Sequence, residues 1–399
     1  SNTEIWIMPL ENPDGTYAGG DNTVYGATRA NANSVDLNRN YKNPRNGDHP
    51  DGEEWQIETI TMMGFVDTMH FVMSANMHGG TELVNYPWDS WTSSENLHPD
   101  NDWWEFVGVE YADEVHTVSP SNYMDTDEDG NGSIGVTHGA DWYYAFGSRQ
   151  DYLNYYARCR ELTLELSDVK TLSESELLNH WNYNKNSFLN YIKQSHYGFR
   201  GIVTNACTGE PMEANIFVEG HDTDNTDVYS HLPHGDYYRP ILAGTYDLTF
   251  SAPGFESQTI TGLTVSNYDT TIVNVSLAPA APVSDFTSDV TTSCTGEIDF
   301  LSAAVGVDTW SCDFGDGNTS TEENPVHTYT ADGTYTVELT VTNCGGVGSD
   351  THTVTDFITI NLPTAPTVSD ADRCGSGSVY LTASGSGTLN WYDAATGGT

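Results

Sequence analysis

Two arginines and three asparagines lie within the eleven residues from Arg29 to Arg39. At the end of this stretch, Asn38 and Arg39 place an amide beside a planar, two-pronged donor, a combination that suits a carboxylate ligand. Arg29 adds a second fixed positive charge. The competing interpretation is a structural ion pair between Arg29 and Asp36. We favour the ligand interpretation, because two arginines this close are unusual in a chain with 13 Lys+Arg against 57 Asp+Glu.

His78 and Glu165 are two further side chains with candidate chemistry. His78 follows the apolar stretch 71–77 and precedes two glycines that leave room for a ligand. Glu165 lies within residues 162–166, where strand alternation puts three leucines on one face and the carboxyl on the other. Partial burial there raises the pKa of the carboxyl towards a range useful for a general base. On these residues alone, a structural histidine and a solvent-facing glutamate stay open as alternatives.

The elements that position these residues are strands alternating with helices. Strands are expected over residues 4–9, 71–77 and 160–166, and helices over residues 54–69, 102–118 and 174–193. This alternation predicts an α/β domain that binds ligands beyond the carboxyl ends of its strands. After residue 197 only short strand-like runs follow, separated by turn residues, which predicts all-β sandwich modules in series.

The composition narrows the class of protein. The chain has 399 residues, a formal net charge of −44 and a sequence pI of about 4.1. That charge excludes a surface for nucleic acid and argues against docking to an anionic membrane. No apolar run approaches the length of a membrane span. Cys294 and Cys344 bracket a β-rich segment and are placed to form a bridge, which would suit an oxidising compartment.

Six motifs follow one another along the first half of the chain: Asn12–Gly15, Arg29 with Asn38 and Arg39, His78–Asp89, Gly139–Tyr143, Gln150 with Asp151, and Thr163–Ser167. In this order they resemble the motifs of zinc metallocarboxypeptidases, most closely the regulatory branch that includes carboxypeptidases D, E, M and N. The resemblance covers residues 1–197 and implies a mixed-sheet α/β fold. It also implies an exopeptidase that uses one zinc ion.

The later residues resemble β-modules that accompany such enzymes. Residues 198–279 resemble the transthyretin-like sandwich of the same branch. Residues 282–361 resemble a PKD domain, with Trp310–Gly317 and Gly333–Val337 as its most specific stretches. Residues 363–399 resemble the start of an Ig-like domain. The first domain, 1–197, is then expected to be the C-terminal two-thirds of a carboxypeptidase domain.

The resemblance assigns roles to the catalytic residues. It makes His78 a zinc ligand and Glu165 the general base, and it gives Arg29 the task of stabilising the oxyanion. Asn38 and Arg39 hold the free α-carboxylate of the substrate.

The resemblance also assigns two specificity and closing residues. Asp89 lies eleven residues past His78, where members specific for basic residues carry an aspartate, so we expect removal of C-terminal Lys or Arg. A tyrosine of the family closes over the peptide. Strict counting puts Asn154 at its position, and we assign Tyr155 with a shift of one residue.

One departure from the family concerns the metal. The family's other two zinc ligands come from a His-x-x-Glu motif upstream of the Asn12–Gly15 turn, and no such motif occurs in this sequence. We therefore expect a chain truncated at its N-terminus, with the other two ligands outside it. We also expect this fragment to be inactive alone.

An acidic loop contains a second candidate metal site. Asp125, Asp127 and Asp129 match the first half of an EF-hand calcium loop. Position twelve of that loop is Val136 instead of glutamate, and no helix pair flanks it. A calcium-stabilised insertion and a solvated acidic loop both stay open.

Three hypotheses on function follow. The first is a secreted or cell-surface bacterial metallocarboxypeptidase that acts on peptide or protein C-termini, with β-modules for attachment or polysaccharide contact. The second is a non-catalytic peptidase-like surface protein that only binds C-termini. The third, an endo-acting or cell-wall-directed relative, should lack the grip of Asn38 and Arg39. None of them needs a nucleic acid partner or a membrane span.

Overall fold

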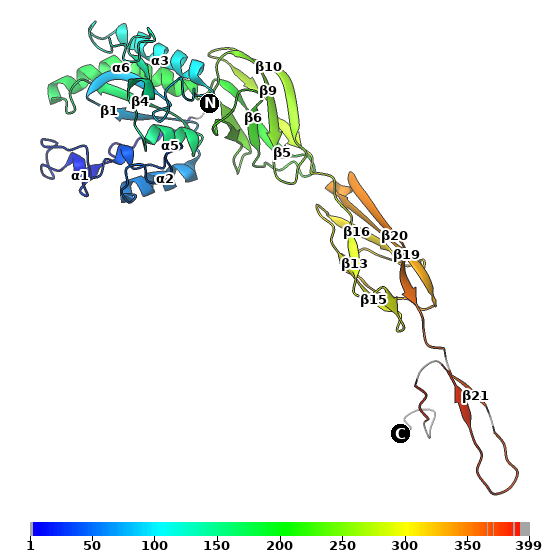
Figure 1. Cartoon of the computed structure of the whole chain (residues 1–399). Coiled ribbons are helices and arrows are strands. Elements are labelled where there is room, and N and C mark those ends of the chain that lie inside the picture. The colour runs from blue at the N-terminus through cyan, green and yellow to red at the C-terminus, as the bar shows by residue number, and fades with distance from the viewer. Residues whose placement is uncertain (1–2, 365, 370, 386–387, 392–399) are drawn as a thin grey trace. The chain divides into compact units, whose positions relative to one another are not determined.

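The structure, a computed structural model, describes residues 3–364, 366–369, 371–385 and 388–391. The chain forms two compact units, Ser1–Leu277 and Ala278–Thr399. All α-helices of the described residues belong to the first unit (Figure 1).

A four-stranded mixed sheet in the order β1-β4-β2-β3 forms the centre of the helical part of the first unit. β1 runs parallel to β4, β4 antiparallel to β2, and β2 parallel to β3. The strands are β1 (Met73–His78), β2 (Thr81–Tyr86), β3 (Val136–His138) and β4 (Arg160–Ser167). A mixed sheet surrounded by helices confirms the expected α/β class.

Helices pack on both faces of this sheet. α3 and α6 lie on one face and α2 and α5 on the other (Figure 1). Leu162 and Leu164 of β4 join the apolar cluster under α3 and α6, whereas Tyr41 joins the cluster of α2 and α5. The helices are α1 (Pro13–Thr16), α2 (Ile57–Met69), α3 (Asn101–His116), α4 (Gly139–Trp142), α5 (Arg149–Tyr155) and α6 (Glu174–Gln194), with a 3-10 turn η1 (Leu37–Arg39). No described helix is long and apolar enough to cross a membrane.

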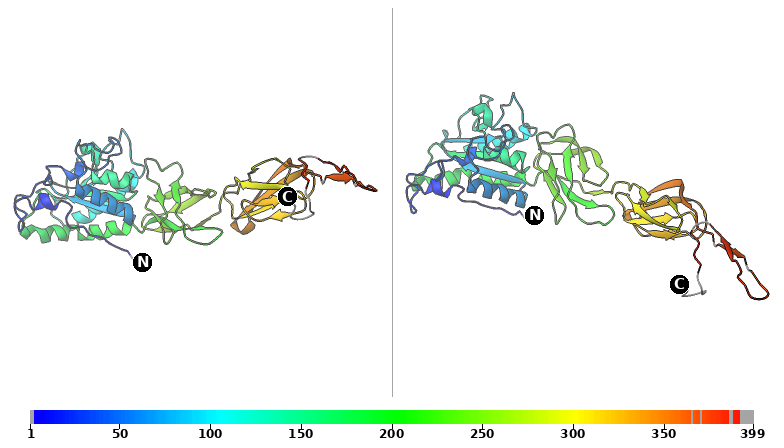
Figure 2. Two further views of the ribbon diagram at one scale, coloured as in Figure 1. Left: turned by 90° about the horizontal axis from the view of Figure 1, so that it is seen from below. Right: turned by 60° about the horizontal axis from the view of Figure 1, so that its bottom comes forward.

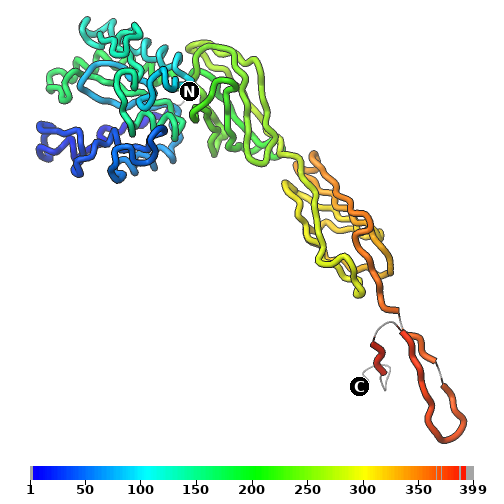
Figure 3. The backbone as a smooth tube through the Cα atoms, viewed as in Figure 1, coloured from blue at the N-terminus to red at the C-terminus, as the bar shows by residue number. Residues whose placement is uncertain are grey.

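The rest of the first unit is a β-sandwich, which the chain enters directly from α6 (Figure 3). Its sheets have the orders β10-β9-β6-β7 and β11-β5-β12, with β8 paired to β5. Phe199, Ile216 and Phe250 are fully buried between them. The strands are β5 (Gly198–Asn205), β6 (Asn215–Val218), β7 (Val228–Tyr229), β8 (Asp236–Arg239), β9 (Gly244–Ser251), β10 (Gln258–Val265), β11 (Thr270–Ile272) and β12 (Val275–Leu277).

The second unit consists of strands, as the two views of Figure 2 show. One sheet has the order β13-β15-β18 and the other β14-β20-β19-β16-β17. Its strands are β13 (Phe286–Ser288), β14 (Thr292–Ser293), β15 (Glu297–Ser302), β16 (Thr309–Asp313), β17 (Thr319–Ser320), β18 (Val326–Thr328), β19 (Gly333–Asn343) and β20 (Gly348–Ile360), with a 3-10 turn η2 (Cys344–Gly346).

The Ig-like prediction for residues 363–399 is only partly covered by the structure. β21 (Thr367–Ser369) and β22 (Thr382–Ser384) pair antiparallel there. Residues 365, 370, 386–387 and 392–399 lie outside the described part of the chain. An Ig-like domain over this range therefore stays a prediction.

The structure differs from the sequence-based expectation at several elements, of which three bear on the site. The strand expected over residues 4–9 is irregular chain, and Ile7 is 82% exposed, because no described strand pairs with this segment. β2 was not predicted, since Thr, Glu and Asn interrupt its apolar residues. α5 replaces an expected loop: Ser148 caps it by accepting a 3.2 Å hydrogen bond from the Asp151 N–H.

The predicted bridge between Cys294 and Cys344 is wrong, because Cys294 carries a free, exposed thiol. Cys294 follows β14, which pairs with the last residues of β20. Cys344 lies in η2, before β20 begins. The length of β20 thus separates the two positions.

Candidate active site at the carboxyl ends of β1 and β4

The paired ends of β1 and β4 bring two predicted side chains together. His78 is the last residue of β1, and its partner in the parallel register is Glu165 of β4. Partnered residues on neighbouring strands direct their side chains to the same face of a sheet. The imidazole and the carboxyl therefore share one face at the C-terminal edge of β1, where α/β proteins bind ligands.

The environment of His78 favours a neutral imidazole. Burial, together with the positive charge of Arg29, lowers the pKa of His78 to about 4. The Asn76 amide nitrogen lies 3.1 Å from His78 Nε2 and fixes the ring. A neutral imidazole is the form that binds a metal ion.

The environment of Glu165 favours a carboxyl that exchanges a proton near neutrality. Burial raises its pKa to about 7, and the negative charge of Asp89 adds to this. The positive charges of Arg29 and Lys170 oppose the rise. A carboxyl with such a pKa is suited to general acid–base work.

Arg29 forms the structural ion pair that was weighed for it and also lies close enough to His78 and Glu165 to influence them. Its Nε donates a 2.6 Å hydrogen bond to Asp36, so the structural ion pair is present. The same guanidinium lowers the pKa values of His78 and Glu165. Asn12 holds the backbone in place by donating to the Arg29 carbonyl at 2.9 Å.

Asn38 and Arg39 lie on η1 beside the start of α5. Asn38 Oδ1 accepts a 2.9 Å hydrogen bond from the Arg149 N–H, which leaves the amide NH₂ group to donate elsewhere. The charge of Arg39 lowers the pKa values of both Asp89 and Tyr143 against the larger effect of their burial. Arg39, Asp89 and Tyr143 are therefore neighbours.

Asp89 sits at the centre of a buried polar cluster. Asn85 donates to its carboxylate at 3.0 Å, and the Asp89 N–H donates to Asp151 Oδ1 at 2.9 Å. Burial raises the pKa values of both acids, and their mutual repulsion raises that of Asp151 further. Ser90 also donates to Asp151. A Cβ on Gly139 would lie 2.2 Å from Asp89 Oδ1, so only glycine permits this approach.

Gln150 belongs to one of the six motifs, but no role was assigned to it from the sequence. Its side chain is fully buried, and neither amide atom has a hydrogen-bond partner within the described residues. Asn85 Oδ1 is buried and unpaired in the same sense. Buried amides without partners are uncommon and call for an explanation, of which an absent ligand is one. The signal in the sequence was the Gln-Asp pair, of which Asp151 contacts Asp89.

Tyr143 lies beside Arg39, Asp89 and Glu165, whereas Tyr155 contacts Trp88. The pKa of Tyr143 responds to burial and then to Arg39, Asp89 and Glu165, which places its hydroxyl among them. Tyr155 instead packs edge-on against Trp88, with ring centroids 6.2 Å apart. It is the last residue of helix α5 and is partly buried. The signal in the sequence was the Gly139–Tyr143 motif, which ends in Tyr143.

The acidic loop uses its carboxylates to stabilise its own turns. Asp127 accepts from the Gly132 N–H at 3.2 Å, and Asp129 accepts from the His138 N–H at 2.8 Å. Asp125, the third predicted ligand, does not join them in a metal-binding group among the described residues. The calcium prediction receives no support from this arrangement.

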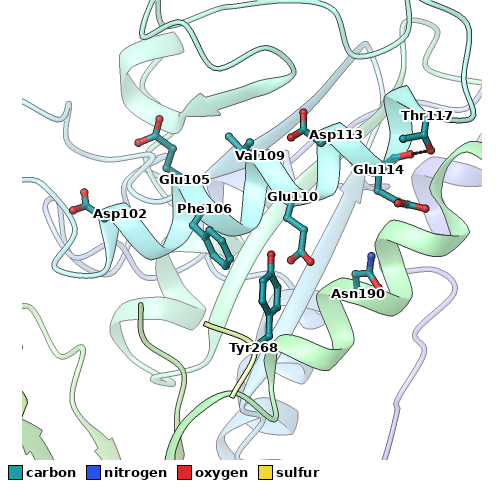
Figure 4. Close-up of a pocket in the computed structure, with 10 residues that line it drawn as sticks. All are labelled: Asp102, Glu105, Phe106, Val109, Glu110, Asp113, Glu114, Thr117, Asn190 and Tyr268. Atoms are coloured by element: carbon teal, nitrogen blue, oxygen red, sulfur yellow. Dashed lines mark hydrogen bonds between the residues drawn. The ribbon is translucent and has the colours of Figure 1, made fainter. Parts of the chain in front are cut away.

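A separate groove of about 590 Å³ opens along α3 (Figure 4). Its walls carry five carboxylates together with Phe106 and Tyr268. None of the predicted site residues lines it, and it contains no histidine, cysteine or arginine among its lining residues. The groove therefore lacks the groups that the chemistry at β1 and β4 would use. Its lining is Asp102, Glu105, Phe106, Val109, Glu110, Asp113, Glu114, Thr117, Asn190 and Tyr268.

The fit of a metal ion to these residues is partial. Within the described ranges, no group of three or more His, Cys, Asp or Glu side chains is placed to hold a metal. His78 combines a buried, neutral imidazole with a place at the end of β1, opposite Glu165. A catalytic zinc ion is held by several protein ligands, so His78 can hold one only together with ligands from outside the described residues.

Comparison with protein families finds three matches along the chain. Residues 1–187 match the zinc carboxypeptidase family, and residues 198–278 match the carboxypeptidase regulatory-like domain. Residues 278–359 match the PKD domain. The three matches follow one another along the chain in the order zinc carboxypeptidase, regulatory-like domain and PKD domain.

Similar proteins include several carboxypeptidases. Carboxypeptidase M of Mus musculus is 35% identical over 275 residues, covering 66% of this chain and 59% of the relative. The catalytic chain of carboxypeptidase N of Mus musculus is 34% identical, with 69% and 65% covered. Carboxypeptidase D of Homo sapiens is 34% identical, with 65% and 19% covered. The chain thus spans less than two thirds of the length of each of these relatives.

Proposed function

Residues 1–187 belong to the zinc carboxypeptidase family, and from this premise we propose that the protein is a metallocarboxypeptidase that removes C-terminal Lys or Arg from peptides or proteins. The observation that carries this proposal is the meeting of His78 and Glu165 at one sheet edge, under the charge of Arg29.

The carboxylate grip makes the proposed enzyme an exopeptidase. Asn38 has its amide oxygen anchored on Arg149, so its NH₂ group is oriented for an acceptor. Arg39 supplies the two-pronged positive charge that matches a free α-carboxylate. Tyr143, whose hydroxyl lies near Arg39, closes over the bound chain end. An endo-acting enzyme has no use for such a grip.

The reacting groups of the chain have complementary tasks. Glu165, with a pKa near 7, accepts the proton of the attacking water and later gives it to the leaving amine. Arg29 stabilises the negative charge that develops on the scissile oxygen. When bound, a zinc ion held in part by His78 would supply a Lewis acid for the scissile carbonyl.

Selection of a basic C-terminal residue is assigned to the cluster around Asp89. The carboxylate pairs with an ammonium or guanidinium group, and the unpaired oxygens of Gln150 and Asn85 accept the remaining N–H bonds. A bound cation would also lower the raised pKa values of Asp89 and Asp151. The substrate thus satisfies polar atoms that the chain leaves unpaired.

Calorimetry with matched peptides tests the carboxylate grip. A peptide ending in a free C-terminal Arg should bind the chain, and the same peptide with an amidated C-terminus should bind about 100-fold more weakly. Arg39→Ala should abolish the difference, whereas Arg45→Ala, a matched arginine paired with Glu95, should keep it. Equal binding of both peptides by the native chain would contradict the proposal.

Hydrolysis tests the catalytic assignment. In a zinc-loaded protein that contains these residues, Glu165→Gln should lower kcat by about 100- to 10,000-fold, because the general base is lost. Glu161→Gln, four residues earlier on the same strand, should leave kcat unchanged once the fold is verified. Cleavage at internal bonds in place of C-terminal ones would overturn the exopeptidase assignment.

A non-catalytic binder of C-termini is the second candidate. The observation that favours it is that the described residues contain no group of three metal-binding side chains. Such a protein would pass the calorimetric test and show no hydrolysis with zinc present. Loss of Glu165 would then leave binding unchanged.

We extend the proposal to location and to the β-modules. Secretion or display on a bacterial cell surface is supported by the acidic composition, which suits a soluble extracellular protein. Contact of the modules with polysaccharide is part of the same proposal. Immunodetection in the culture medium and on intact cells tests the first point, and pull-down with insoluble polysaccharide tests the second.

A further inference from the structure

A buried cluster of charged residues joins the helical part of the first unit to the β-sandwich that follows it. Asp100 and Arg160 come from the helical part, and Asp222 and Arg239 come from the sandwich. Each of the four is at most 4% exposed. We call these four residues the charge hub.

Asp100 is the centre of the charge hub. Arg239 binds both of its carboxylate oxygens, at 2.9 and 3.0 Å, and Arg160 donates to one of them at 3.0 Å. His221 of the sandwich adds a contact of 2.8 Å. Arg239 also donates to Asp222 at 2.5 Å. The sandwich thus fixes Asp100 more extensively than the helical part does.

The charge hub is connected to the specificity acid by two aromatic rings. The Asp100 N–H donates to His98 Nδ1 at 2.9 Å. The His98 ring packs on Trp88, with ring centroids 4.6 Å apart. Trp88 immediately precedes Asp89 in the sequence. A displacement of Asp100 would therefore be passed to the residue next to Asp89.

Trp88 has little freedom to move in response to a displacement of His98. Its side chain is fully buried, and its carbonyl accepts a 2.8 Å hydrogen bond from the Ala140 N–H. Its N–H donates to His138 at 3.3 Å. Packing in protein interiors is dense, so a ring held on all sides transmits strain to its own backbone.

We propose that Arg239 of the β-sandwich is a positioning residue for Asp89, acting through Asp100, His98 and Trp88. The sandwich is then a part of the specificity pocket's scaffold, although none of its residues touches substrate. The inference rests on the proposed function only in assigning Asp89 the selection of a basic side chain. The coupling between Arg239 and Asp89 stands on contacts alone.

Hydrogen exchange of the whole chain tests the coupling. Arg239→Lys keeps the charge but loses the two-pronged contact, and should speed exchange of the Asp89 and Ala140 amides by about tenfold. The control is Asp227→Asn, which weakens another pair across the same boundary, Arg158 with Asp227 at 3.2 Å. That variant should leave these amides within about twofold of the native rate.

Two results overturn the proposal. One is unchanged exchange at Asp89 and Ala140 in folded Arg239→Lys. The other is an equal rise in both variants, which would mean general loosening of the boundary. If Arg239→Lys does not fold, His98→Phe takes its place, because it keeps a ring on Trp88 but loses the acceptor for Asp100. It should reproduce the rise at the same two amides, and its failure to do so overturns the proposal as well.

Calorimetry separates this inference from the proposed function. The ratio of affinities for peptides ending in Arg and in Leu should fall about tenfold in Arg239→Lys and stay unchanged in Asp227→Asn. If the native chain binds neither peptide, the proposed function fails, and the exchange rates still decide the coupling. If the native chain prefers the peptide ending in Arg and Arg239→Lys keeps the same ratio of affinities, the positioning role is wrong and the proposed function stands.

Discussion

Two clusters of buried charge lie in the first unit, and they differ in how their acids are paired. In the charge hub, Asp100 accepts from two arginines and a histidine, and positive charge lowers its pKa well below the usual range despite burial. Around Asp89, the acids face amides, a serine and each other, and burial raises their pKa values. The acids of the charge hub form ion pairs with arginines, whereas no ion pair of Asp89 or Asp151 with a cation is present among the described residues.

This difference separates a structural cluster from a ligand site. Buried charges that have opposite charges beside them stabilise one arrangement of the chain, and removing one partner is costly. Buried acids that repel each other beside an unpaired amide lower stability until a ligand binds. Buried charge by itself therefore does not mark a site, whereas the lack of a compensating partner does.

The largest effect should come from breaking the charge hub. Arg239→Ala leaves Asp100 buried with only part of its positive partners, and should lower the free energy of unfolding of the first unit by about 3–5 kcal/mol. Urea unfolding followed by far-UV circular dichroism measures the change.

Arg158→Ala is the matched control for this variant. Its side chain is 27% exposed and pairs with Asp227 across the same boundary. Exposed pairs contribute little, so the expected loss is about 0–1 kcal/mol. Similar losses in the two variants would remove the distinction between the charge hub and an ordinary ion pair.

Removing the specificity acid should act with the opposite sign on stability. Asp89→Asn relieves the repulsion with Asp151. It should therefore leave the free energy of unfolding unchanged or raise it slightly. It should also reduce the preference for peptides ending in Arg over Leu by about 2 kcal/mol, or about 30-fold. Calorimetry measures the preference, and urea unfolding measures the stability. A destabilised variant that keeps its preference would contradict both the site and the comparison.

The acid sensitivity of the charge hub should come largely from His98. Burial lowers its pKa to about 3 from 6.5, so the folded state favours the neutral ring. The resulting stability is fully present above pH 6.5 and is lost as the pH falls towards the folded value. Between pH 7 and pH 5 the native chain should lose about 2 kcal/mol from this ring. The groups that face it are Asp100, Arg160, Arg239 and His221.

His98→Phe isolates this contribution. The variant should lose less stability than the native chain between the same two pH values, by the amount assigned to the ring. Urea unfolding at both pH values provides the comparison. Equal losses in the two proteins would show that His98 is not the group responsible.

The smallest effect concerns the acidic loop. Calcium should not change the melting temperature, because the carboxylates of Asp127 and Asp129 already accept backbone N–H bonds. A true site would stabilise the chain by about 2.7 kcal/mol at a calcium concentration 100 times the Kd. Differential scanning fluorimetry with calcium and with chelator makes the measurement. A rise that Asp125→Asn abolishes would restore the calcium hypothesis.

The sequence predicted the elements that position the site better than the residues within it. Alternation placed Glu165 opposite its leucine neighbours, and β1 and β4 form within two residues of the expected bounds. The register that pairs Glu165 with His78 could not be predicted, because pairing depends on contacts between distant strands. No role could be given to Gln150 from the sequence, because the lack of a hydrogen-bond partner is a property of the folded interior.

The misplaced tyrosine has a local cause. Residues 149–155 carry aromatic and polar side chains without a clear helical period, and the cap at Ser148 was overlooked. Read as a loop, the segment leaves Tyr155 available for a ligand. As helix α5, it directs Tyr155 against Trp88, and Tyr143 takes the place beside Arg39.

The spacing of Asp100 and Arg239 has a consequence for biosynthesis. The two residues are 139 positions apart in the chain, yet form a two-pronged contact in the folded protein. Translation proceeds from the N-terminus, so the helical part leaves the ribosome while its buried aspartate has only Arg160 for a cationic partner. The charge of Asp100 in the helical part is therefore fully balanced only after strand β8, which ends in Arg239, has been synthesised.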